Sequence, residues 1–158
     1  MTSTTTNPEE ASGIRVDVVR VANFRSLRNI EVTLGKTTVL VGMNNSGKTS
    51  FLRALHLALG ADRRTVTFDD FFVSESGERA GEILIDVRIV PTPGNEFDQS
   101  WIDSDFGGDG TISVDANNRE FVAFRPRVWH DALRSDFLVD RTVRTDWPEV
   151  GSWQAKPA

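Results

Sequence analysis

The sequence predicts an α/β fold in which mixed and antiparallel strands surround one strand–loop–helix unit. Three observations predict this class. Residues 14–21 alternate between apolar and polar side chains, which is the period of a half-buried strand. Residues 37–41 form a continuous β-branched and apolar run, typical of a strand buried on both faces. A glycine-bounded loop, residues 42–49, then leads from this run into a helical pattern of apolar residues.

Two more elements are predicted before that loop. Residues 23–27 form a polar break that ends the first strand, and residues 30–34 form a second short strand. Gly35 and Lys36 then make a turn into the third strand, residues 37–41. Two strands and a turn therefore precede the run that enters the loop.

The elements after the loop are a helix and a strand. Residues 48–59 are predicted to be helical, because their apolar side chains recur every three or four positions. Gly60 stands where a C-terminal helix cap belongs. Residues 82–90 are predicted to form a strand, which Pro91 stops.

The last third of the chain has weaker patterns. Residues 94–110 form a polar, glycine-rich loop, and residues 111–115 and 121–124 form a hairpin that turns at Asn117 and Asn118. Residues 128–138 are predicted to be a helix from the spacing of large apolar residues. These residues are Trp129, Leu133 and Phe137.

The length of 158 residues and the 39% hydrophobic content are those of one globular domain. We expect a disordered tail over residues 1–13, an N-terminal lobe over 14–146 and an irregular end over 147–158. The tail has no basic stretch followed by an apolar run, so it does not resemble a signal peptide. With no stretch long enough to span a membrane, the expected location is cytoplasmic. The lack of cysteine excludes disulfides and thiolate metal sites.

Charge is unevenly distributed along the chain. Residues 1–60 carry seven basic and four acidic side chains, whereas residues 61–158 carry eleven basic and nineteen acidic ones. An acidic second half argues against a large nucleic-acid surface within this chain. Contact with DNA is therefore expected only through a larger assembly.

The loop Gly42-Met43-Asn44-Asn45-Ser46-Gly47-Lys48-Thr49 satisfies the pattern G-x-x-x-x-G-K-[ST] at every fixed position. Its glycines let the backbone arch around a phosphate with the N–H groups pointing inward. Lys48 is placed to meet the β- and γ-phosphates as the catalytic cation, and the Thr49 hydroxyl to bind Mg²⁺. The pattern predicts a nucleotide triphosphate site. Its binding residues are Gly42, Asn44, Asn45, Ser46, Gly47, Lys48, Thr49 and Ser50.

Together with the loop, the motif Asn23-Phe24-Arg25-Ser26-Leu27 resembles a particular group of P-loop proteins. These are ABC/SMC-type ATPases of the RecF-like kind, and most closely the ATPase domain of the overcoming-lysogenisation-defect (OLD) nucleases. The resemblance is close over residues 14–60 and looser to about residue 90, where an Asp-Asp-Phe loop at residues 69–71 also matches.

This resemblance implies bound ATP and Mg²⁺, head-to-tail dimerisation of the ATPase, and often a C-terminal TOPRIM nuclease acting on DNA in repair or anti-phage defence. It also implies that Asn23, Arg25 and Ser26 lie beside the nucleotide, with Arg25 able to face the phosphates. The alternative for Arg25 is a solvated arginine in a loop between strands.

Three other motifs of a complete ABC-type ATPase are not recognisable in the sequence. They are a Walker B strand ending in Asp-Glu, a signature motif and a switch histidine. Residues 83–86 and 137–140 imitate Walker B, but Val87 and Arg141 stand where the glutamate belongs. Asp86 also continues an alternating strand, so it is predicted to be an outward polar residue rather than a Mg²⁺ ligand. A similar interpretation applies to Asp140.

Several other polar residues are weak candidates. Gln99 is either a nucleotide-sensing glutamine or a solvated loop residue. Asp103 and Asp105 imitate the D-x-D of a TOPRIM metal site, but their glycine-rich surroundings favour a solvated loop. His56 and His130 have no partner motif, so packing or surface roles are expected for both.

These observations predict the N-terminal lobe of a larger ATPase, completed by a missing C-terminal lobe or a companion chain. Two alternatives remain open. One is a stand-alone regulatory module that binds nucleotide without turnover. The other is a compact P-loop kinase that uses Asp86 as its acidic strand residue. A GTPase is disfavoured, because the N-K-x-D guanine motif needs an Asn-Lys pair that the sequence lacks.

Overall fold

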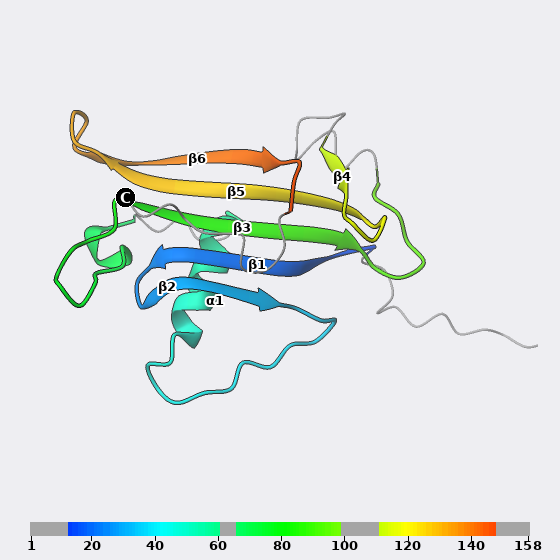
Figure 1. The fold of residues 1–158 in the computed structure, drawn as a ribbon, viewed down its shortest axis with the longest axis horizontal. Helices are drawn as coiled ribbons and strands as arrows, with labels where there is room; N and C mark the ends of the chain where they lie inside the picture. Colours follow the sequence, from blue (N-terminus) through cyan, green and yellow to red (C-terminus); the bar gives the residue numbers. More distant parts are fainter. Residues whose placement is uncertain (1–12, 61–65, 99–110, 148–158) are drawn as a thin grey trace, which may run out of the picture.

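The computed structural model describes residues 13–60, 66–98 and 111–147. These residues form a six-stranded sheet with one α-helix against one of its faces (Figure 1). The elements are β1 (Ile14–Phe24), β2 (Leu27–Thr33), α1 (Lys48–Ala58), the short 3₁₀ helix η2 (Phe68–Asp70), β3 (Glu82–Pro91), β4 (Ile112–Val114), β5 (Glu120–Asp131) and β6 (Asp136–Arg144).

The sheet has the order β2-β1-β3-β5, and all of its described pairings are antiparallel. Strands β4 and β6 share the outer edge of β5: β4 pairs with its first residues and β6 with the rest. The predicted strands at residues 14–21, 30–34 and 82–90 are confirmed, as is the hairpin that turns at Asn118, whose φ is 58°.

The face of the sheet under α1 is apolar. Alternate residues of β1, β3 and β5 contribute side chains to one buried cluster with Phe51, Ala54 and Ala58 of the helix. The helix ends as predicted, because Gly60 adopts a φ of 70° just beyond it and donates its N–H to the Leu57 carbonyl. This packing fixes the start of α1 close to the turn between β1 and β2. The sheet residues of the cluster include Val19, Val21, Ile83, Ile85, Val87, Phe124 and Val128.

The opposite face carries charged side chains that are buried in pairs. Arg125 donates to both carboxylate oxygens of Asp86, at 2.5 and 2.7 Å, and this hydrogen bonding is the main reason why the pKa of Arg125 is raised. Arg88 likewise donates to Asp17, its Nε lying 3.0 Å from the carboxylate. Asp86 lies on the outward face, away from α1, as expected, but Arg125 covers its carboxylate and leaves it 1% exposed.

The predicted third strand is wrong. Residues 37–41 adopt no strand, and they run in the long connection between β2 and α1, which swings away from the sheet (Figure 1). Val39 is 77% exposed and Val41 is 89% exposed. The apolar, β-branched composition favours a buried strand, but a strand forms only where a neighbour supplies hydrogen-bond partners. No described strand lies beside this segment.

The predicted helix over residues 128–138 is also wrong, because this stretch is the β5–β6 hairpin. Trp129 lies opposite Leu138, and His130 lies opposite Phe137. Asp131 organises the turn by accepting the N–H of Leu133 at 2.9 Å, and Ser135 supplies a φ of 52°. Spacing of four residues between apolar side chains fits a helix, but here it spans a turn.

Parts of three expected regions fall outside the described residues. These are residues 1–12 of the expected tail, 99–110 of the expected loop and 148–158 of the expected C-terminal end. In the described part of the chain, the single α-helix is too short to span a membrane.

Candidate functional site

The glycine-bounded loop has the backbone that its sequence demands. Gly47 has a φ of 88° and is the N-cap of α1, and Asn45 has a φ of 69°. A Cβ on Gly42 would lie 2.6 Å from the Ser46 hydroxyl, and one on Gly47 would lie 2.8 Å from Cδ2 of Leu27. A Cβ at either position would therefore force a neighbouring side chain to shift, and the left-handed backbone also favours glycine at Gly47.

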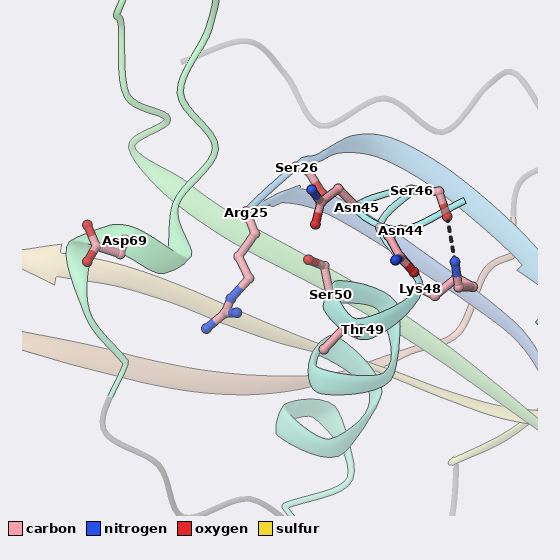
Figure 2. A pocket seen from close by; sticks show the side chains of 10 residues that line it. Arg25, Ser26, Asn44, Asn45, Ser46, Lys48, Thr49, Ser50 and Asp69 are labelled. Carbon is pink, nitrogen blue, oxygen red and sulfur yellow. Dashed lines mark hydrogen bonds between the residues drawn. The ribbon is translucent and has the colours of Figure 1, made fainter. Parts of the chain in front are cut away.

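Lys48 lies in the first turn of α1 and bonds to its own loop. Its Nζ donates to the carbonyls of Gly42 and Met43, at 2.5 and 2.6 Å. It also donates to the Ser46 hydroxyl at 3.1 Å, the bond drawn in Figure 2. These three acceptors match the three donors of an ammonium group. The cation is thus held within the loop, beside the position of any anion that the loop encloses.

The N-terminus of α1 has no competing negative charge. No acidic residue lies in its first turn, and no side chain caps its N–H groups. The first N–H groups of a helix have no partner within the helix and carry a partial positive charge. Together with Lys48, they form a site of the kind that binds phosphate groups.

The turn between β1 and β2 forms the neighbouring wall. Asn23 and Arg25 adopt left-handed backbone conformations, with φ of 62° and 53°. The segment around η2 holds this turn: Arg25 donates its N–H to the Asp70 carbonyl at 2.8 Å, and Phe72 donates its N–H to the Asn23 carbonyl at 2.9 Å. Residues 23–25 and 70–72 therefore form one unit, although they lie far apart in the sequence.

The side chain of Arg25 is fixed by the same segment. Its Nε and one terminal nitrogen lie 2.8 and 2.7 Å from Oδ1 of Asp70. The other carboxylate oxygen of Asp70 accepts the N–H of Thr67 at 3.0 Å, which completes a capping box around η2. Arg25 thus lies in the turn between the strands and is held in an ion pair, with 29% of its side chain exposed.

The loop and this wall line an open cavity of about 870 Å³ (Figure 2). That volume lies within the range of roughly 300–1,000 Å³ that small-molecule sites occupy. In Figure 2, Arg25 and Lys48 lie on opposite sides of Thr49 and Ser50. The lining residues are Arg25, Ser26, Asn44, Asn45, Ser46, Gly47, Lys48, Thr49, Ser50 and Asp69.

The structure thus brings nine of the predicted site residues together around one cavity. The other two, Gly42 and Asn23, support the wall: Gly42 accepts a hydrogen bond from Lys48, and Asn23 anchors Phe72. Sequence reasoning did not assign Asp69 to the wall or Asp70 to Arg25. The Asp-Asp-Phe motif marks both residues, but only the fold shows that η2 reaches the β1–β2 turn.

Other candidates lie elsewhere. Asp86 is on the sheet face opposite α1, bound to Arg125, and Asp140 is exposed on β6. His130 packs against Phe68 and Phe137, with ring centroids 4.8 and 5.1 Å apart. His56 is exposed on α1, so each histidine has one of the two roles expected for both, packing or surface. Gln99, Asp103 and Asp105 lie outside the described residues.

Comparisons with known proteins identify the family of this chain. The family model of the AAA ATPase domain matches residues 15–124, which is more than half of the chain. The chain belongs to the AAA ATPase domain family. The match runs from β1 through the loop and α1 into β5, so it includes both walls of the cavity.

Curated relatives match a shorter part of the chain. An OLD nuclease of Thermus scotoductus is 39% identical over 70 residues, which is 42% of this chain and 13% of the relative. A DNA replication and repair protein RecF of Nitrosococcus oceani is 37% identical over 81 residues, which is 49% of this chain and 22% of the relative. The chain thus spans less than a quarter of the length of either protein.

Among solved structures, the fold is similar to one from a study of ATP-driven dimerization and DNA-stimulated activation of SMC ATPases. The TM-score is 0.50 at 19% identity, and the match covers 82% of this chain and 70% of the SMC ATPase chain. This likeness in fold and the family match together confirm the predicted fold class, a P-loop ATPase domain with a mixed or antiparallel sheet and few helices. The chain is an ATPase-type domain that is similar in sequence to parts of an OLD nuclease and a RecF protein, and similar in fold to an SMC ATPase.

Proposed function

We propose that this chain binds ATP through the loop at residues 42–49. The observation that carries the proposal is the arrangement around the cavity: the ammonium of Lys48 and the uncapped start of α1 lie on one side, and Arg25 lies on the other. Both cations thus flank the helix terminus, where a polyphosphate chain gains most from the helix dipole and free N–H groups. A volume of about 870 Å³ also leaves room for a nucleoside beside the phosphates.

Mg²⁺ is proposed to accompany the nucleotide. Thr49 lines the cavity and is exposed, so its hydroxyl is available as a ligand beside the phosphates. The ion prefers oxygen ligands and keeps several waters, so one hydroxyl and the phosphate oxygens are a suitable protein-side set. When bound, the ion would neutralise charge between the β- and γ-phosphates.

A thermal-unfolding titration tests ATP binding. ATP with Mg²⁺ at about 100 times Kd should stabilise the chain by ~2.7 kcal/mol, seen as a rise in Tm. Lys48→Ala should remove most of this rise, because it deletes the cation that the loop holds. Lys36→Ala is the matched control, since Lys36 is exposed and lies outside the cavity. An unchanged Tm of the natural chain in ATP would contradict the proposal.

We also propose that a missing C-terminal lobe or a companion chain covers the segment 37–43. Three apolar side chains of this segment are strongly exposed, and its composition favours a strand that has no described neighbour. A partner that supplies a pairing strand would bury these side chains. The partner would also bring the Walker B and signature residues that hydrolysis needs. The exposed side chains are Val39, Val41 and Met43.

ATP hydrolysis, head-to-tail dimerisation and action on DNA are therefore proposed for the assembly. They are motivated by the names of the relatives: an OLD nuclease, a repair protein RecF and SMC ATPases that dimerise with ATP. Roles in DNA repair or anti-phage defence, at a cytoplasmic location, follow as part of the same proposal.

A module that binds ATP without turnover is the second candidate for the chain by itself. It is favoured by the position of Asp86, which lies on the far face of the sheet and so leaves the cavity without this acidic residue. The same position argues against the compact kinase. Phosphate release from the purified chain separates the candidates: turnover that Lys48→Ala abolishes would contradict the passive module.

A further inference from the structure

Two neighbouring carboxylates on η2 have different surroundings. Asp69 is exposed on the wall of the cavity, and in the described part of the chain it has no hydrogen-bond or ion-pair partner. Asp70 is 9% exposed and does not belong to the described wall. Its two oxygens bind Arg25 and the N–H of Thr67. Asp70 can therefore influence a ligand only through the residues that it holds.

Arg25 is the residue through which that influence passes. The pair with Asp70 uses Nε and one terminal nitrogen, so it engages two of the five N–H donors of a guanidinium. The Arg25 side chain remains 29% exposed and lines the cavity. Its other donors are thus available to an anion while the group stays anchored, as the planar fork of arginine allows.

We propose that Asp70 is a positioning residue for nucleotide binding, which acts by holding the guanidinium of Arg25 at the side of the cavity opposite Lys48. The proposal rests on the ATP site proposed above. An unanchored arginine would lose side-chain freedom each time it met a phosphate, whereas the pair with Asp70 removes that freedom beforehand. The backbone bond from Arg25 to Asp70 fixes the root of the same side chain.

The charge of Asp70 also has an electrostatic effect on ATP affinity, opposite in sign to the positioning effect. The Asp70 carboxylate repels the phosphates and offsets part of the Arg25 charge, so its removal would raise affinity if this effect dominated. Because Asp70 is set back behind Arg25 and outside the wall, we expect positioning to dominate.

A double-mutant cycle on the full chain tests this inference, with the ATP dissociation constant measured by calorimetry. Arg25→Ala and Asp70→Asn should each weaken ATP binding by about tenfold, and the double variant should be no weaker than either one. Independent losses that multiply to about a hundredfold would overturn the inference. So would an unchanged or tighter affinity in Asp70→Asn.

Two further variants separate positioning from stability. Thr67→Val removes the hydroxyl half of the capping box but keeps the Arg25–Asp70 pair, so it should lower the urea midpoint and leave ATP affinity unchanged. Equal loss of affinity in Thr67→Val and Asp70→Asn would overturn the inference. Arg25→Lys keeps the charge but lacks the planar fork, and it should lose about as much affinity as Arg25→Ala. Retained affinity in Arg25→Lys would count against positioning, even if Asp70→Asn failed to fold.

The two proposals can fail separately. If the natural chain does not bind ATP, or binds it equally well as Lys48→Ala, the ATP site itself is wrong. If ATP binds through Lys48 but the Arg25 and Asp70 losses are independent, only the positioning role is wrong.

Discussion

Two constraints favour glycine at position 47, a left-handed backbone and a close side-chain contact. Comparison with Gly60 separates their effects on stability. Its φ of 88° belongs to the left-handed region, and its α-carbon faces Leu27 so closely that a methyl group would lie 2.8 Å from Cδ2. Gly60 shares the left-handed backbone, with a φ of 70°, but nothing lies within 4 Å of a Cβ there. The pair therefore separates backbone strain from steric contact.

We predict that Gly60→Ala lowers the free energy of unfolding by about 1 kcal/mol, from backbone strain alone. Gly47→Ala should lower it by a further ~1–3 kcal/mol, because Leu27 must move out of a packed position. Urea unfolding of both variants gives the two values. Equal losses of unfolding free energy in the two variants would show that Leu27 moves aside at no cost in stability.

At the scale of single residues, the loop motif in the sequence marks the residues that line one side of the cavity. The pattern of residues 42–49 fixes spacing over one short segment, and a local motif of this kind carries its own geometry. Asp69 and Asp70 are different, because η2 meets the β1–β2 turn through a contact between residues 45 positions apart. No local pattern encodes that distance. A resemblance to other proteins marked the motif without giving its role.

Among the elements, the β4–β5 hairpin shows how one carboxylate organises a turn. The pKa of Asp115 is lowered: desolvation acts to raise it, but hydrogen bonds from Arg119 and the backbone outweigh this effect. The carboxylate accepts the N–H of Asn117 at 2.9 Å and the N–H of Arg119 at 3.0 Å. The ionised form is thus the one that the folded hairpin prefers.

We predict that Asp115→Asn lowers the free energy of unfolding by about 1 kcal/mol at neutral pH, since hydrogen bonds to a charged acceptor are the stronger kind. Because the folded pKa lies below the unfolded value of about 3.9, this stabilisation is complete above that pH. It is lost as the pH falls through the folded pKa.

Urea midpoints at pH 7 and near pH 2 should therefore differ between the natural chain and Asp115→Asn only at pH 7. Glu120→Gln is the control, because Glu120 is exposed in the same hairpin. A gap that persists unchanged in acid would show that the charge of Asp115 is not what stabilises the turn.

Elements were predicted well where one face of a strand or helix is buried within this chain. Strands β1 and β3 and helix α1 have such faces, so their periodicity matches their surroundings. The two wrong elements fail for different reasons. Residues 37–41 have the composition of a central strand but no described neighbour, and residues 128–138 show helical spacing across a turn. Periodicity cannot report whether a pairing strand exists or where a hairpin bends.

On the scale of the whole molecule, the exposed segment 37–43 beside the loop is expected to matter for assembly more than for the stability of the chain. Val39 and Val41 are mostly exposed, whereas Leu40 between them packs partly against the core cluster. Alternate side chains thus have different environments, as they would in a strand whose second face awaits a cover.

We predict that the double substitution Val39→Ser, Val41→Ser changes the free energy of unfolding of this chain by less than about 0.5 kcal/mol, because exposed side chains contribute little. Leu40→Ala should cost more, roughly 1–2 kcal/mol for a partly buried leucine. In a pull-down with the proposed C-terminal lobe, the double serine variant should lose binding. Full binding by that variant would place the interface elsewhere.

The two faces of the sheet differ in polarity, and this difference determines which face α1 covers. Helix α1 placed on the charged face would separate Asp86 from Arg125 or Asp17 from Arg88, and an unpaired buried charge costs about 3–5 kcal/mol. That cost is a large fraction of the free energy of unfolding of a small domain, which is about 5–15 kcal/mol. The ion pairs far from the cavity thus keep α1 on the apolar face of the sheet. In every folded molecule, Lys48 and Arg25 therefore face a ligand from the same side.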